Sequence, residues 1–141
     1  MSYPEKKLDK SWIQDGITNE TVEWAKSFGE FLQNDESRNR GTGALTTSQI
    51  RKFFGELKRI QADPVKYKED IPLLKAKLAY AVGRDATQRG SQVINKTKIK
   101  EFYQELERGI NAIRVNEKTD IVNFVKIVEA IVAYHKFYGG K

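Results

Sequence analysis

Cysteine is absent from this sequence, and histidine and methionine occur only once each. Without cysteine the chain forms no disulfide, offers no thiolate to a metal ion and has no cysteine nucleophile. A zinc site is not expected either, because one histidine cannot supply the usual ligand set. The lack of disulfides fits a reducing compartment, and we expect a cytoplasmic protein.

Long apolar runs and catalytic motifs are missing as well. No apolar stretch reaches the roughly 18 residues of a transmembrane helix, and residues 1–7 lack the apolar run of a signal peptide. The glycine-rich loop that cradles phosphates does not occur. His135 has no carboxylate or hydroxyl beside it at local spacing, so we interpret it as a packing residue rather than a general base. We therefore expect no enzyme: no catalytic residue, no metal, no cofactor and no membrane partner.

What the sequence does contain predicts one folded domain. Its 141 residues are 39% hydrophobic and 11% aromatic, which is enough to bury a core. Residues 1–16 are polar apart from Trp12-Ile13 and predict an N-terminal arm that docks at this pair. Residues 17–141 predict a single helical domain.

Apolar residues recur at helical spacing in five segments. The predicted helices cover residues 18–34, 46–62, 72–85, 96–114 and 120–138. Thr46 followed by Gln49 forms a capping box, the clearest helix start in the chain. Asn95 is the expected cap of the fourth helix, and Thr119 or Asp120 that of the fifth. Residues 86–95 are interpreted as a loop, and no strand is expected.

The last helix, residues 120–138, is apolar on nearly every side. A helix of this kind is expected to be buried on nearly every side, with the rest of the chain wrapped around it. The sequence thus predicts an all-α fold, a compact bundle of about five helices around a nearly all-apolar C-terminal helix. Its last turn, with Tyr134, Lys136 and Tyr138, is expected to reach the surface, where a neighbouring copy or an RNA backbone could meet it.

Charge is unevenly distributed along the chain, whose net charge is +6. Residues 71–84 contain no Asp or Glu, whereas residues 101–107 contain three Glu. Segregated cations are typical of proteins that contact a phosphate backbone. A charged, solvated surface explains the same pattern equally well, so the residues alone leave both interpretations open. No recognition-helix motif supports the reading of bases.

Three stretches carry a resemblance to a known family. They are Leu45-Thr-Thr-Ser-Gln-Ile-Arg-Lys-Phe53, Leu74-Lys-Ala-Lys-Leu-Ala-Tyr-Ala-Val-Gly-Arg84 and Val128-Glu-Ala-Ile-Val-Ala-Tyr-His-Lys-Phe-Tyr-Gly-Gly140. In this order they resemble the small subunit of type III-A (Csm) CRISPR effector complexes. The resemblance covers roughly residues 45–140. Residues 1–44 carry no matching motif, and the long N-terminal arm departs from the family's pattern.

The resemblance implies an all-helical, non-catalytic, RNA-binding subunit that serves antiviral defence. Copies of it would stack along CRISPR RNA and target RNA, beside the backbone and large subunits of the effector complex. The matching motifs assign RNA contacts to Arg51, Lys52, Lys75, Lys77, Arg84 and Lys136. The charge pattern, rather than the resemblance, adds Lys58, Arg59 and Arg89. The alternative is a helical protein–protein scaffold or dimerisation module without nucleic-acid binding.

Overall fold

The structure, a computed structural model, describes residues 3–39, 41–114 and 116–141. It is mostly helical, as the sequence predicts, but it also contains a small two-stranded hairpin. In chain order the elements are α1 (Lys10–Gln14), α2 (Asn19–Gln33), the 3-10 turn η1 (Ser37–Asn39), α3 (Thr47–Ala62), α4 (Asp70–Asp85), β1 (Ala86–Arg89), β2 (Gln92–Asn95), α5 (Ile99–Ala112) and α6 (Lys118–Phe137). No helix of these residues is both long and apolar enough to cross a membrane.

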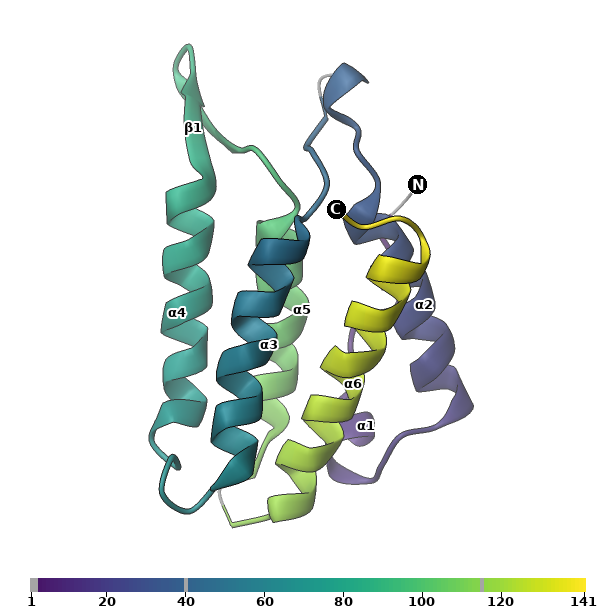
Figure 1. The fold of residues 1–141 in the computed structure, drawn as a ribbon, viewed down its shortest axis with the longest axis vertical. Helices are drawn as coiled ribbons and strands as arrows, with labels where there is room; N and C mark the ends of the chain where they lie inside the picture. Colours follow the sequence, from purple (N-terminus) through teal and green to yellow (C-terminus); the bar gives the residue numbers. More distant parts are fainter. Residues whose placement is uncertain (1–2, 40, 115) are drawn as a thin grey trace.

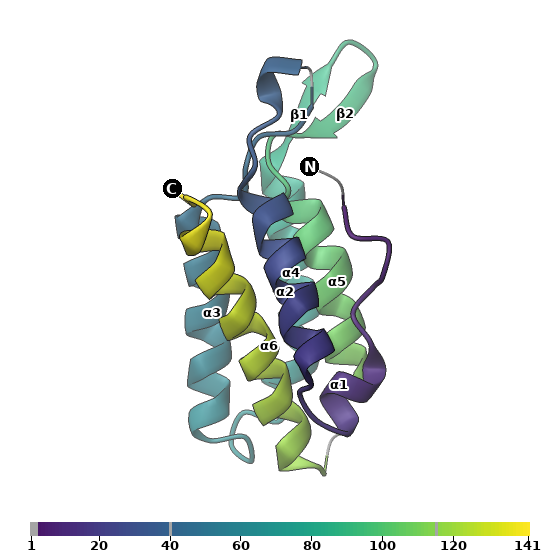
Figure 2. The same cartoon turned by 90° about the vertical axis from the view of Figure 1, so that its right-hand side faces the viewer.

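The long helices form two closely packed pairs, α4 with α5 and α2 with α6. Helix α3 contacts both α4 and α6 and so joins the two pairs on one side. The short α1 contacts α5 and α6 near the end of the bundle that is opposite the hairpin (Figures 1 and 2). Large side chains such as Phe28, Phe102 and Phe124 fill the space between the pairs and are 0% exposed. The pairs are thus held by one continuous apolar core.

Helix starts with a strong local signal are predicted correctly. The Thr46 hydroxyl accepts a hydrogen bond from the Gln49 N–H at 3.1 Å, and the Gln49 side chain accepts one from the Thr46 N–H at 2.8 Å. Thr18 caps α2 in the same way, with Thr21 as its partner. Both capping boxes satisfy N–H groups that would otherwise lack an acceptor.

The prediction that residues 86–95 form a loop is wrong. They form an antiparallel hairpin, with Thr87 opposite Ile94 and a turn at Gly90-Ser91. Gly90 has a φ of +61°, a conformation that a residue without Cβ adopts at little cost. A glycine-serine pair between Thr87 and the run Val93-Ile94 is a hairpin signal that outweighs the polar composition of the segment.

Two predicted helix caps are also wrong. Asn95 lies at the end of β2, where its side-chain amide donates to the Val82 carbonyl at 2.9 Å, and α5 begins only at Ile99. Asp120 lies within the first turn of α6 rather than before it. It is 0% exposed and accepts hydrogen bonds from the backbone and the side chain of Arg114, both at 2.9 Å. The buried Asp120 carboxylate therefore pairs with the half-exposed side chain of Arg114 instead of capping the helix.

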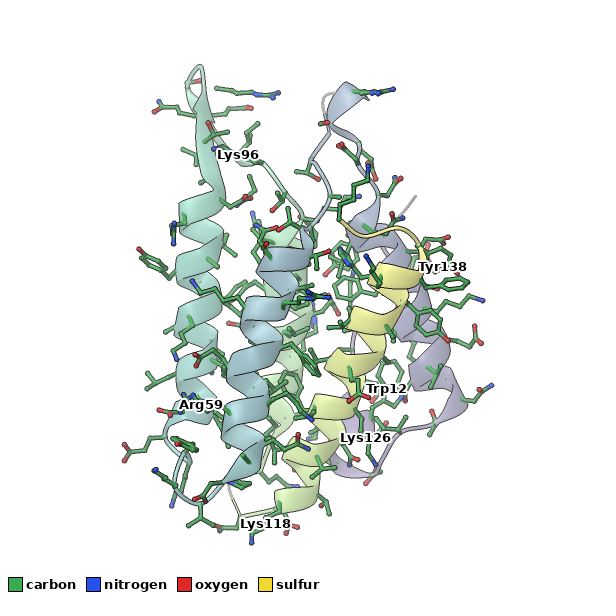
Figure 3. The ribbon with its side chains drawn as sticks, viewed as in Figure 1. Trp12, Arg59, Lys96, Lys118, Lys126 and Tyr138 are labelled. Carbon is green, nitrogen blue, oxygen red and sulfur yellow. The ribbon has the colours of Figure 1, made fainter. Side chains whose placement is uncertain are left out.

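Helix α6 is not enclosed on all sides. Its buried residues include Phe124, Val128 and Ile131, which face the core. Lys126 and Glu129 are exposed, and Figure 3 shows Lys126 on the outer side of the helix. Helix α6 thus packs against α1, α2, α3 and α5 and leaves a strip that includes Lys126 and Glu129 exposed, so the expectation that the chain wraps it on nearly every side is met only in part.

The segment before α2 packs along the bundle through specific contacts. Trp12 and Ile13 are 2% and 0% exposed, and the Trp24 indole N–H donates to the Lys6 carbonyl at 2.8 Å. The Leu8 N–H donates to the buried carboxylate of Glu105 at 2.9 Å. Of the predicted arm, Met1 and Ser2 lie outside the described residues.

Lys98 is a buried lysine that the sequence does not reveal. It is 1% exposed, and its ammonium donates to the carbonyls of Phe31 and Asn34 at 2.9 Å and to the Glu36 carboxylate at 2.8 Å. The Phe31 carbonyl also accepts the Asn34 N–H at 3.3 Å, so the ammonium adds a second, stronger donor there and supplies a donor to the Asn34 carbonyl beyond the end of the helix. It joins the end of α2, the following segment and the start of α5.

Replacing Lys98 by methionine tests this role. Lys98→Met keeps the length of the side chain but removes its donors, and we expect the free energy of unfolding to fall by about 2–4 kcal/mol. Lys96→Met, an exposed neighbour, is the control and should change it by less than about 0.5 kcal/mol. Urea denaturation of both variants provides the comparison, and equal effects would contradict the assigned role.

Candidate nucleic-acid interface

The outer side of α3 carries four of the predicted RNA-binding residues. Ile50, Phe53, Leu57 and Ile60 are buried and fix which side of the helix faces the core. Because side chains repeat at 100° per residue, Arg51, Lys52, Lys58 and Arg59 point outward, and all four are exposed.

Glu56 lies where α3 meets α4 and pairs with two of the predicted cations. Its carboxylate is 2.7 Å from the Lys77 ammonium on α4 and 3.2 Å from the Arg59 guanidinium on its own helix. Arg59 also contacts Asp70 at 3.3 Å and lies over the Tyr67 ring. The hydrogen bond from Lys77, followed by that from Arg59, lowers the pKa of Glu56. Glu56 therefore stays ionised and offsets part of the positive charge.

Arg51 and Lys52 have no acidic partner within 4.0 Å among the described residues. Lys58 likewise has no acidic partner within 4.0 Å among these residues. Its ammonium lies 5.9 Å from the centroid of the Phe54 ring, which carries no charge to compensate it. Arg51 and Lys58 are seven residues apart, so they share the flank of α3 opposite the Glu56 line. These three side chains are the cations on α3 available to an external anion.

Lys75 does not lie on the same surface as the predicted RNA-binding residues of α3. Its ammonium donates to the Asn111 side chain on α5 at 2.8 Å, so it projects from the side of α4 that faces α5. Lys77 projects from the side that faces α3. Two lysines two residues apart on one helix thus serve different surfaces.

The remaining predicted cations lie toward the hairpin end of the bundle. Helices α3 and α4 run antiparallel (Figure 1), which brings Arg84 to the same end as Arg51 and Lys52. Tyr80, on the line of Lys77 and Arg84, is 69% exposed. Arg89 is exposed on β1 beyond the end of α4. We define the basic face as the cations that α3 and α4 present together, namely Arg51, Lys52, Lys58, Arg59, Lys77 and Arg84.

Lys136 belongs to α6 but lies beside the start of α3. The adjacent His135 contacts the Leu45 carbonyl through Nε2 at 2.6 Å, and the Thr47 N–H donates to the Lys141 carbonyl at 2.8 Å. These two bonds hold the last turn of α6 against the beginning of α3. Lys136 itself is exposed and extends the positive surface at this end.

Sequence reasoning missed two features of this surface. Glu56 was not recognised as the partner of Lys77, although its spacing to Arg59 is typical of an i, i+3 ion pair. Phe137 was not expected at the surface, yet it is 74% exposed. The tertiary pairing of Glu56 with Lys77 has no local signal, since these residues are 21 positions apart.

His135 is a packing residue, as predicted. It is 1% exposed, and its Nε2–H donates to the Leu45 carbonyl. Burial lowers the pKa of its imidazole, the Leu45 bond opposes this change, and the neighbouring Lys136 adds to it. No group of three metal-ligating side chains occurs among residues 3–39, 41–114 and 116–141.

The lowered pKa predicts a pH-dependent stability. Below pH 6.5 the unfolded imidazole takes up a proton that the folded one resists, so stability is retained above this pH and lost as the pH falls through it. His135→Gln keeps an N–H donor for Leu45 but does not titrate. Lowering the pH from about 7.5 to about 5.5 should therefore reduce the melting temperature of the native protein more than that of the variant, which thermal unfolding at each pH measures. Parallel curves for the two proteins would rule out a buried neutral histidine.

Comparisons with known proteins give the chain a family context. The family model Csm2 Type III-A matches residues 17–141. The chain is also similar to "CRISPR system Cms protein Csm2" of Streptococcus thermophilus, with 32% identity over 111 residues, which cover 75% of this chain and 83% of that protein. No solved structure matches the chain.

Proposed function

Since the chain belongs to the Csm2 Type III-A family, we propose that it is a non-catalytic, RNA-binding small subunit of a type III-A CRISPR effector complex. Its partners are the CRISPR RNA, the target RNA, other copies of itself and the backbone and large subunits. Copies stack along the paired RNA and contact its backbone. Residues 17–141 act as one helical domain, on which residues 3–16 dock.

The observation that carries this proposal is the set of uncompensated cations on the basic face. Arg51, Lys52 and Lys58 are exposed and have no acidic partner within 4.0 Å in the part of the chain that the structure describes. Arg51 and Lys58 are two helical turns apart, about 10 Å, so they reach different phosphates. Lys77 and Arg59 contribute less, because Glu56 compensates their charge.

Backbone contact suits the chemistry of a guide-programmed complex. An A-form duplex hides most of its sequence from side chains and is bound through its shape and its phosphates. Base pairing with the guide already supplies sequence specificity, so the protein has no need to read bases. One copy with three or four phosphate contacts binds weakly, and several copies on one RNA gain avidity.

Removing the uncompensated cations provides the main test. The triple variant Arg51→Ala, Lys52→Ala and Lys58→Ala should bind a guide–target RNA duplex more weakly. The slope of log affinity against log salt should fall in magnitude by about 2–3, because each lost phosphate contact removes roughly 0.7–0.9. Fluorescence anisotropy from low to moderate salt measures both quantities.

The matched control removes three exposed lysines from other helices: Lys10→Ala, Lys26→Ala and Lys100→Ala. It lowers the net charge by the same amount but should keep the salt slope. If both triple variants lose slope equally, binding reflects overall charge rather than the basic face. An unchanged affinity in the first variant would contradict the proposal.

Glu56 offers a test in the opposite direction. Glu56→Gln removes the acidic partner of Lys77 and one of the two acidic partners of Arg59, which keeps Asp70, so RNA affinity should rise by a few-fold and become more sensitive to salt. Glu23→Gln on α2 changes the net charge equally and serves as control. An equal gain in both variants would exclude a local role for Glu56.

A further inference from the structure

Three aromatic side chains gather at the end of α6 and form what we call the aromatic platform: Tyr134, Phe137 and Tyr138. The Phe137 ring centroid lies 6.3 Å from that of Tyr134 and 5.0 Å from that of Tyr138. Phe137 is 74% exposed, the most exposed of the large hydrophobic residues that the structure describes. Val93 and Val65 are exposed to a similar extent, at 72% and 71%, so exposure alone does not mark a site; what sets Phe137 apart is the pair of aromatic rings beside it.

The rings are arranged so that Phe137 stays open. Its plane lies at 85° to that of Tyr134 and at 83° to that of Tyr138, so neither tyrosine stacks flat on it. The two tyrosines are half-buried and limit the movement of the central ring. Phe137 therefore presents a flat apolar surface in a defined orientation.

The backbone beneath the platform is held in place. The N–H of Tyr138 donates to the Tyr134 carbonyl at 3.0 Å, and that of Gly140 to the His135 carbonyl at 2.8 Å. On the α2 side, Gly29 allows a close approach, because a Cβ at this position would lie 2.9 Å from that of Tyr134. Figure 3 shows Tyr138 at the end of α6 that lies nearer the hairpin.

Charge around the platform favours an anionic ligand. Lys136 is exposed within the same turn, and no acidic side chain lies within 4.0 Å of its ammonium among the described residues. The contacts of His135 with Leu45 and of Thr47 with Lys141 place this turn beside the start of α3. The last turn of α6 thus lies beside the start of α3, while Figure 3 shows Tyr138 on the side of α6 that is turned away from α3, so a strand bound to the basic face reaches the platform by crossing the end of α6.

We propose that the aromatic platform stacks on an unpaired base of the RNA that the basic face holds, with Phe137 as the stacking ring and Lys136 on the adjacent phosphate. This inference rests on the proposed function and adds a second kind of contact to it. Aromatic rings stack on any base, so the contact tolerates all sequences. It distinguishes an unpaired nucleotide from a paired one, because a base within a duplex does not expose its face.

A protein partner fits the platform less well. The exposed side of α6 before it carries Lys126, Glu129 and Ala133, so the apolar surface does not extend along the helix. Stable protein interfaces cover about 800 Å² on each partner, far more than one exposed ring provides. A single base is of the right size for this patch.

The test uses leucine and tryptophan at position 137. Phe137→Leu keeps an apolar side chain but loses the aromatic face, whereas Phe137→Trp keeps the face. We expect Phe137→Leu to bind a short single-stranded RNA about tenfold more weakly and Phe137→Trp to bind it like the native protein. The salt slope should be unchanged in both, since no phosphate contact is lost. Affinity for a fully paired RNA duplex should also be unchanged.

The control is Val65→Ala, a similarly exposed apolar residue, at 71%, which lies at the other end of the bundle. The proposal is overturned if Phe137→Leu binds single strands normally, if Phe137→Trp is as weak as Phe137→Leu, or if duplex binding falls equally. Normal RNA binding by Phe137→Leu with loss of assembly with other subunits would assign the platform to a protein. The triple variant of the basic face separates this inference from the proposed function. If that variant has a reduced salt slope while Phe137→Leu binds RNA normally, only the stacking role of the platform is contradicted.

Discussion

The buried ammonium of Lys98 fixes how the chain passes from α2 to α3, and the basic face depends on that passage. It binds the last carbonyls of α2 and the Glu36 carboxylate. Two backbone bonds continue the connection, from the Gly43 N–H to the Lys96 carbonyl and from the Leu45 N–H to the Leu32 carbonyl, both at 2.7 Å. Helix α3 then begins at the Thr46 capping box. Its direction and rotation are therefore set before its first basic residue, and the exposed flanks follow from the buried stripe.

The cations of α3 and α4 divide into two kinds with different roles. Lys77 and Arg59 meet Glu56 between the helices, where they hold the helices together at an exposed boundary. Exposed pairs of this kind add little stability, so their main effect is to set the local charge. Arg51, Lys52 and Lys58 meet no such partner and give the surface its positive potential. A polyanion is drawn to these residues first, and salt weakens that attraction.

Sequence patterns predict the parts of this molecule that are decided locally. The Thr46 box and the buried stripe of α3 were predicted because cap and periodicity lie within one helix. The hairpin was missed although Gly90-Ser91 signals it, since the polar residues around it resemble a loop. Lys98 looks like a surface lysine until α2 and α5 are brought together. The opposite directions of Lys75 and Lys77 likewise depend on which helices flank α4.

The central claim is that α3 and α4 present the RNA-binding surface. Photo-cross-linking of the assembled effector complex, with 4-thiouridine in the CRISPR RNA and peptide mapping by mass spectrometry, tests it most directly. The account predicts cross-links within residues 47–62 and 70–85, with further ones in residues 133–141. Cross-links confined to the outer sides of α2 and α5 would contradict it.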